Sequence, residues 1–88
     1  MKHYYRDVPG LGNVALSRHA QERAIEERVT DQQVEQALMH GKDTPDADAL
    51  WREHAGLRLV IVEPKENRGA RLMVTMYRVQ AMARAKAR

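Results

Sequence analysis

The spacing of apolar residues changes near residue 50, and this change limits the kind of fold that the chain can adopt. Before it, apolar residues recur three and four positions apart, as in Val34, Ala37 and Leu38, which is the spacing of one helix face. After it, the runs 57–63 and 71–79 are rich in branched residues and alternate in the manner of strands. Helical segments followed by strands predict an α+β domain.

Two helices are predicted, each starting after its own capping residue. Ser17 is a good cap for a first helix over residues 18–28. Thr30 is followed three positions later by Gln33, the spacing of a capping box, so a second helix is expected from residue 31. Gly41 predicts a left-handed stop for this second helix.

Three antiparallel strands are expected in the second half of the chain, over residues 50–54, 57–63 and 71–79. Residues 1–16 contain turn signals around Gly10 and Gly12, with 14–16 as a short strand or lead-in, and Pro45 indicates a loop over 43–49. The expected architecture is two N-terminal helices packed on a three- to four-stranded antiparallel sheet in two layers. Residues 1–79 are predicted to form a single α+β domain, with 80–88 as a basic, flexible C-terminal tail.

The composition excludes several classes of protein. A chain of 88 residues builds one modest core, and none of its segments has the ~18–20 apolar residues of a membrane span. Cysteine is absent, so neither disulfides nor thiolate metal sites hold the fold, and a reduced, cytoplasmic setting is expected. No cofactor and no metal are expected, because the spacing of the four histidines, His3, His19, His40 and His54, matches no zinc motif.

The net charge of +3 does not describe a uniformly basic surface. Four basic residues and no acidic residue lie in the last eleven positions, 78–88, so the excess belongs to the C-terminal end. The rest of the chain lacks the basic surface of a typical nucleic-acid-binding domain.

His19 and Arg23 are the first candidate site residues. They are four positions apart and would share one face of the first helix. An imidazole can move a proton and a neighbouring guanidinium can hold a phosphate, which suits phosphodiester chemistry. The alternative is a solvated helix face on which Arg23 pairs with Glu26 or Glu27. Spacing alone leaves both interpretations open.

Strand 71–79 supplies the second group of candidates. Strict alternation would place Arg71, Thr75 and Tyr77 on one face, and Arg78 with Val74 on the other. Tyr77 joins His19 and Arg23 as a catalytic candidate, and the candidate substrate-binding residues are Arg71, Thr75 and Arg78. The alternative is a packing tyrosine beside a solvent-facing arginine.

The order and spacing of several short motifs over residues 15–79 resemble a small bacterial and phage family whose function is unknown. The matching motifs are Ser17-x-His19-Ala20-x-x-Arg23, Glu27-Arg28-Val29-Thr30, Val34-Glu35-x-Ala37-Leu38, Gly41, Leu59-Val60-Ile61-Val62 and Val74-Thr75-Met76-Tyr77.

This family is related to RelE-like toxins and to barnase, so the resemblance implies helices that precede a curved antiparallel sheet. It also implies ribonuclease activity without a metal. His19 and Arg23 would then be the helix-borne site pair, with Thr75 and Tyr77 on a strand. Ser17 would cap the helix that positions His19.

Three functions remain open from the sequence. The first is a metal-independent RNase or toxin-like RNase relative, acting on RNA and paired with a protein antitoxin. The second is a non-catalytic phage or bacterial binding protein that engages a host protein or nucleic acid. The third is a structural subunit that forms a homodimer through the edge of strand 71–79.

Overall fold

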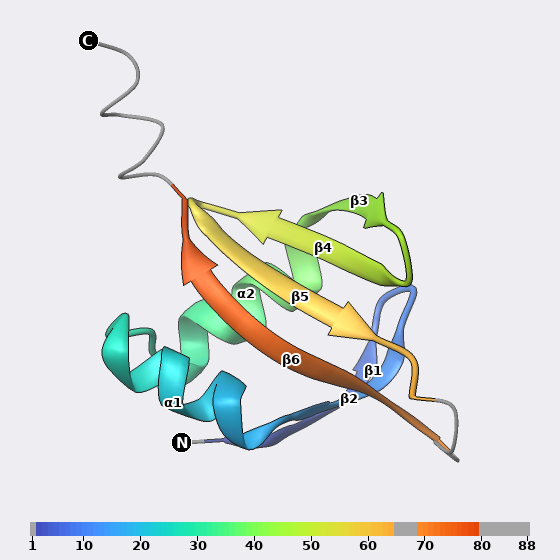
Figure 1. Cartoon of the computed structure of the whole chain (residues 1–88), viewed down its shortest axis with the longest axis horizontal. Coiled ribbons are helices and arrows are strands. Elements are labelled where there is room, and N and C mark those ends of the chain that lie inside the picture. The colour runs from blue at the N-terminus through green and yellow to red at the C-terminus, as the bar shows by residue number, and fades with distance from the viewer. Residues whose placement is uncertain (1, 65–68, 80–88) are drawn as a thin grey trace, which may run out of the picture.

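The computed structural model describes residues 2–64 and 69–79, which form one curved sheet and two helices (Figure 1). The tail predicted over 80–88 lies outside the described residues. The elements in chain order are β1 (Tyr4–Val8), β2 (Gly12–Leu16), α1 (Arg18–Glu26), α2 (Asp31–His40), β3 (Lys42–Asp46), β4 (Ala49–His54), β5 (Leu57–Val62) and β6 (Ala70–Arg78). The strand order is β1-β2-β6-β5-β4-β3. Strands β2 and β6 are parallel, and the other neighbours are antiparallel.

The predicted fold class is wrong in its sheet. The two helices do not stand at the N-terminus of the fold, because β1 and β2 precede them, and the described sheet has six strands of mixed direction rather than three or four antiparallel ones. A RelE- or barnase-like two-layer arrangement is therefore not what this chain forms.

Strand β1 escaped prediction, and β2 was expected only as a short strand or lead-in over residues 14–16, because turn residues dominate this part of the sequence. Gly10 and Gly12 both have a φ of +76°, which glycine adopts without a steric penalty, and Leu11 N–H donates to the Val8 carbonyl at 3.0 Å. This tight connection allows β1 to pair with β2 and bury Tyr5 beside Val14. Alternation over such short segments is too weak to identify from sequence alone.

Strand β3 was missed for a different reason. It lies at the edge of the sheet, every one of its side chains is exposed, and it contains Pro45. Proline removes one backbone donor, which an edge strand tolerates because one side of that strand has no neighbour. The same proline predicts a loop when only the sequence is considered.

Both helices start where their caps predict. The Ser17 hydroxyl accepts a hydrogen bond from Ala20 N–H, and the capping box of Thr30 and Gln33 is complete. Gly41 ends α2, but with a φ of −71° rather than in the left-handed region. A Cβ at residue 41 would lie 2.5 Å from the Ala37 carbonyl oxygen and 2.5 Å from Arg52 Cγ, so close approach explains this glycine.

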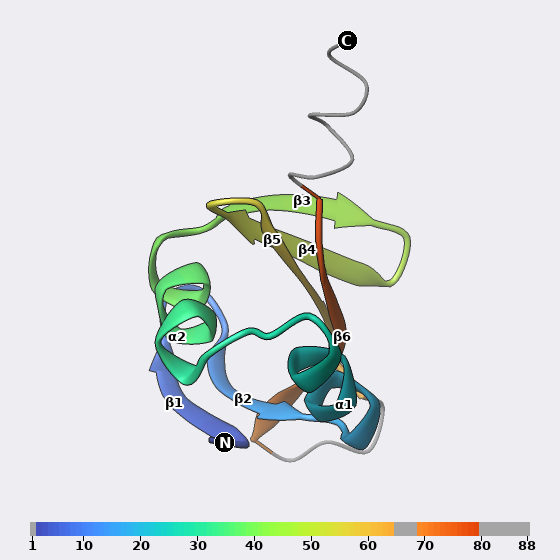
Figure 2. The same ribbon diagram turned by 90° about the vertical axis from the view of Figure 1, so that its left-hand side faces the viewer.

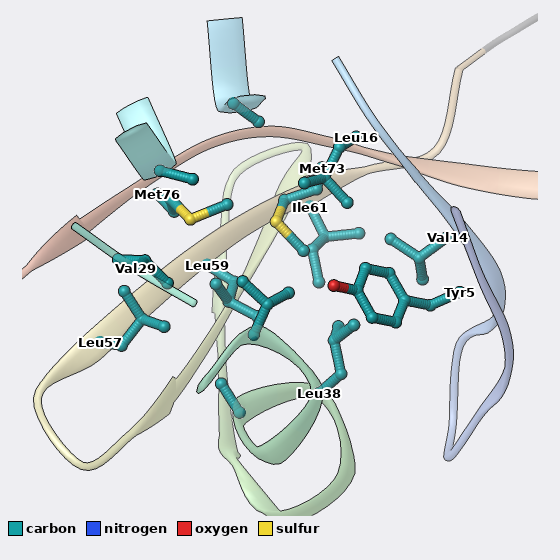
Figure 3. Close-up of a cluster of buried hydrophobic side chains, with 14 of the residues drawn as sticks. Tyr5, Val14, Leu16, Val29, Leu38, Leu57, Leu59, Ile61, Met73 and Met76 are labelled. Atoms are coloured by element: carbon teal, nitrogen blue, oxygen red, sulfur yellow. The ribbon is translucent and has the colours of Figure 1, made fainter. Parts of the chain in front are cut away.

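The hydrophobic core fills the concave side of the sheet, which curves around α2 (Figure 2). Leu38 from α2 packs among side chains from several strands, and the Tyr5 phenol points into the same cluster (Figure 3). The Tyr5 hydroxyl is buried and makes no hydrogen bond to any described residue. The most deeply buried large side chains are Leu38, Leu59, Ile61, Met73, Met76, Val14 and Val34.

One irregularity in β6 changes which residues share a face. Val60 pairs with Thr75, but the next residue of β5, Ile61, pairs with Met73, so Val74 is an extra residue in β6. Met73 and Met76 are consequently both buried although they are three positions apart. The strict alternation predicted for 71–79 is wrong, because Arg71 lies on the side of Met73 while Thr75 and Tyr77 lie on the opposite side.

Beyond the end of β2, the cap and one side chain of α1 hydrogen-bond to the backbone of β6. Strand β2 ends at Leu16, opposite Met73, and the next residue, Ser17, donates through its N–H to the Met73 carbonyl and through its hydroxyl to the Val74 carbonyl. Further along α1, Arg23 Nε donates to the Met76 carbonyl at 3.3 Å. Side chains and the cap of α1 therefore satisfy backbone groups that a sheet edge would leave open.

No helix in residues 2–64 or 69–79 combines the length and the apolar character needed to cross a bilayer.

Candidate functional site

The structure places the predicted helix-borne pair at different depths. His19 lies in the first turn of α1, where its side chain is exposed and forms no hydrogen bond or ion pair with any described residue. Arg23 is half-buried, and its three guanidinium nitrogens contact Glu26, Glu27 and the Met76 carbonyl oxygen. The Arg23 to Glu26 and Arg23 to Glu27 distances are 2.8 Å and 3.1 Å. Arg23 would have to release these partners before it could hold a phosphate.

The four predicted strand residues divide between the two faces of the sheet. Thr75 and Tyr77 lie on the face turned away from the core, which we call the outer face. Arg71 lies on the core side near one end of β6, 4.0 Å from Glu63. Arg78 lies on the core side at the other end, where Nε donates to the Glu27 carbonyl at 3.1 Å and Nη2 donates to the Arg28 carbonyl at 3.2 Å. Only Thr75 and Tyr77 are therefore brought together.

Tyr77 belongs to a compact group of side chains on the outer face, which we call the Arg58 cluster: Trp51, Glu53, Arg58 and Tyr77. Cross-strand pairing assembles it, since Arg58 stands opposite both Glu53 in β4 and Tyr77 in β6. The guanidinium carbon lies 4.2 Å from the centre of the Trp51 ring and 5.4 Å from that of Tyr77. Both distances are within the range of a cation–π contact.

Hydrogen bonds fix the orientation of the Arg58 guanidinium. Its Nε donates to Glu53 Oε2, and its Nη1 donates to the Tyr77 hydroxyl at 3.0 Å. Burial acts to lower the pKa of Arg58, but the hydrogen bonds from Arg58 to Tyr77 and Glu53 outweigh it, and the pKa is raised above its usual value. Arg58 is therefore a permanent cation, and its Nη2 donates to no residue within the described ranges.

The Arg58 guanidinium gives the cluster a group that can contact a small anion. A guanidinium held by neighbouring side chains presents its remaining donors in a fixed direction, which favours two-point contact with a phosphate. Glu53 supplies a carboxylate that can accept a proton, and Tyr77 supplies a phenol that can donate one. Trp51 packs against one face of the guanidinium, and a base could stack on the other face of Arg58.

Sequence reasoning missed Arg58, Glu53 and Trp51 as a group. Arg58 interrupts the apolar run 57–62, and that interruption is the one signal of an outward-facing charge in β5. The partners of Arg58 depend on the register of β4 and β6 against β5, which spacing along the chain does not encode. Trp51 lies half-buried beneath Arg58.

Within residues 2–64 and 69–79, no group of three or more His, Asp or Glu side chains is arranged to hold a metal ion. No family model, curated protein or solved structure matches this chain. The site is therefore interpreted from its own geometry.

Proposed function

We propose that this protein is a metal-independent ribonuclease whose site is the Arg58 cluster on the outer face of the sheet. The observation that carries the proposal is the position of the Arg58 guanidinium, held between the Glu53 carboxylate and the Tyr77 hydroxyl and stacked on Trp51. Arg58 is the phosphate-binding cation of this proposal, and the base, the acid and the aromatic ring each contact it.

The proposed reaction is the attack of a ribose 2′-hydroxyl on the adjacent phosphate. Glu53 takes the 2′-hydroxyl proton, the 2′-oxygen forms a bond to phosphorus, and the bond from phosphorus to the 5′-oxygen breaks. Tyr77 donates its proton to the departing 5′-oxygen, and water returns the proton from Glu53 to Tyr77. The products are a 2′,3′-cyclic phosphate and a 5′-hydroxyl.

Arg58 has two roles in this proposal. Its Nη2, which donates to none of the described residues, contacts the phosphate, and the charge of the guanidinium stabilises the additional negative charge of the transition state. Binding of the phosphate weakens the ion pair between Arg58 and Glu53, which releases the carboxylate to act as a base. The cytoplasmic setting expected from the lack of cysteine is a setting in which RNA is present.

The test is cleavage of a fluorescent RNA by purified protein in EDTA. Tyr77→Phe and Glu53→Gln are expected to slow cleavage by about 10²–10⁴-fold, the usual contribution of a general acid or base. The matched control is Tyr4→Phe, which removes the same atom from an exposed tyrosine and should leave the rate unchanged. Equal cleavage by all these variants, or none by the unmodified protein, would refute the proposal.

His19→Ala separates this site from the one expected on α1. If His19→Ala abolishes cleavage while Glu53→Gln does not, the catalytic groups lie on α1 and the Arg58 cluster is not the site. If both lose activity, the RNA contacts both surfaces.

The second candidate is an RNA-binding protein without turnover, favoured by the stacking of Arg58 on Trp51. It predicts that the unmodified protein binds single-stranded RNA in a gel-shift assay and leaves it intact, and that Trp51→Ala weakens binding. A partner other than RNA, such as an antitoxin or a host protein, would appear as a stoichiometric protein complex and no RNA binding.

A further inference from the structure

A second pocket lies on the core side of the sheet, on the other side from the Arg58 cluster. It has a volume of about 240 Å³ and opens between α2, the turn from β4 to β5, and the end of β6. This volume is just below the ~300–1,000 Å³ of pockets for drug-sized ligands, so the pocket would hold part of a ligand of that size while the rest stays in solvent. The lining residues are Gln32, Gln33, Gln36, His54, Ala55, Leu57 and Arg78.

The charge of the pocket favours an anion. Arg78 is a fixed cation, because Nε and Nη2 are anchored on the Glu27 and Arg28 carbonyls and Nη2 also contacts Gln33 Oε1. Its Nη1 donates to no residue of the described ranges, so one edge of the guanidinium remains available. None of the described lining residues is acidic, and His54 is the other ionisable group. The centre of the His40 ring lies 6.0 Å from the centre of the His54 ring.

The rest of the lining suits a flat ring with hydrogen-bonding edges. Gln32 and Gln36 are exposed on α2, and neither side-chain amide has a partner among the described residues. Each amide offers a donor pair and an acceptor, the combination that pairs with the edge of a nucleobase. Leu57 is 3% exposed and forms an apolar floor with Ala55.

We propose that this pocket binds a nucleoside monophosphate. The phosphate contacts Arg78 Nη1, the base lies on Leu57, and the amides of Gln32 and Gln36 contact the edge of the base. The pocket and the Arg58 cluster use different residues on opposite faces of the sheet, so this inference does not depend on RNA cleavage.

The test is titration of the isotope-labelled full chain with AMP, GMP, CMP and UMP, followed by amide chemical shifts. Shifts are expected at Gln36, Ala55 and Leu57 with at least one nucleotide. Inorganic phosphate and the matching nucleoside serve as fragments, and each should bind at least about tenfold more weakly than the nucleotide, because each lacks one set of contacts.

Two variants test the residues. Gln32→Ala with Gln36→Ala removes both amides from exposed helix positions and should weaken nucleotide binding about tenfold. The matched control is Glu35→Gln, which alters a neighbouring position of α2 outside the pocket lining and should bind as the unmodified protein does. Arg78→Gln should abolish the preference for the nucleotide over the nucleoside.

Several results would overturn the proposal. These are an absence of shifts at millimolar nucleotide, shifts confined to other residues, or equal affinity for the nucleotide and one of its fragments. Because Arg78 also anchors the end of α1, its variant is interpreted only if its spectrum remains that of the folded protein. If the Arg78→Gln variant is not folded, the double variant Gln32→Ala with Gln36→Ala decides whether the pocket binds the nucleotide.

Discussion

Arg52 and Asp43 form a two-point ion pair, with Nε to Oδ1 at 2.5 Å and Nη2 to Oδ2 at 2.8 Å. The Arg52 side chain is buried, and its Nη1 also donates to the carbonyl oxygens of Pro9 and Leu38. One guanidinium thus links β3, the turn between β1 and β2, and the end of α2. A single side chain of β4 therefore contacts all three elements, in addition to the backbone pairing of β3 with β4.

Arg52→Met should lower the free energy of unfolding by about 3 kcal/mol, at the lower end of the range for breaking a buried pair because Asp43 is partly exposed. Chemical denaturation at neutral pH measures the loss. The control is Arg18→Met, which removes an exposed arginine paired at 3.9 Å and should change stability by no more than about 0.5 kcal/mol. A similar small loss in both variants would show that Arg52 does not hold these elements together.

Asp43 makes this stabilisation depend on pH. The hydrogen bond from Arg52 lowers the pKa of Asp43 below its ordinary value of 3.8, so folding favours the ionised carboxylate. The Asp43 carboxylate makes its full contribution to the free energy of unfolding above pH 3.8, the pKa of the unfolded state. That contribution is lost as the pH falls through the lower pKa of the folded state. Asp43→Asn should therefore be less stable than the unmodified protein at pH 6, and the difference should shrink below pH 3.8.

Denaturant titrations of the two proteins between pH 2 and pH 7 provide the comparison. Asp46→Asn is the matched control, since it is an aspartate in the same strand for which no ion pair with a described residue is found. A constant difference between Asp43→Asn and the unmodified protein over the whole range would contradict the assignment.

Tyr5→Phe should stabilise the protein by about 1 kcal/mol, because it keeps the ring and removes a buried hydroxyl for which residues 2–64 and 69–79 supply no partner. Thermal or chemical denaturation checks this gain. Tyr4→Phe makes the same change at an exposed neighbour and should be neutral. A loss of stability in Tyr5→Phe would mean that the hydroxyl is satisfied in solution.

Tyr5 also makes the stability of the protein depend on pH in the alkaline range. Burial, with the nearby charges of Asp31 and Glu35, raises the pKa of Tyr5 from 10.0 to about 12. The folded state favours the neutral phenol, so the raised pKa contributes to the free energy of unfolding below pH 10. This contribution is lost as the pH rises towards 12. Tyr5→Phe should lack this loss, which denaturation at pH 9 and pH 11 can show.

Gly41→Ala should destabilise the protein by about 1–3 kcal/mol, the cost of forcing atoms into a packed site. The added Cβ would meet the Ala37 carbonyl oxygen and the stem of Arg52, both at 2.5 Å. Gly69→Ala is the control, because a Cβ at residue 69 meets no atom of the described residues within 4 Å. Equal melting temperatures for the two variants would show that the end of α2 can move aside.

The helices could be predicted because their signals are local. A capping residue and the apolar spacing that follows it act within one or two turns, and both Ser17 and Thr30 cap helices as expected. The sheet could not be predicted to the same extent, because its order depends on which distant strands meet. Nothing near residue 14 indicates that β2 will lie parallel to β6.

In the candidate site, too, the relation between residues of one strand could be predicted, and the partners on neighbouring strands could not. Tyr77 and Thr75 were expected to share a face, and they do. Arg71 was expected beside them, but the extra residue at Val74 turns it to the other side. Arg58 became a candidate only through its partners on two neighbouring strands.

The extra residue at Val74 also affects how chains similar to this one should be compared. If Val74 instead took a regular pairing position opposite Ile61, the first part of β6 would turn over, and Arg71 and Met73 would exchange their surroundings with Leu72. An alignment that slides across this position would equate solvent-facing residues with core residues. Comparisons of β6 should therefore be anchored separately on each side of Val74.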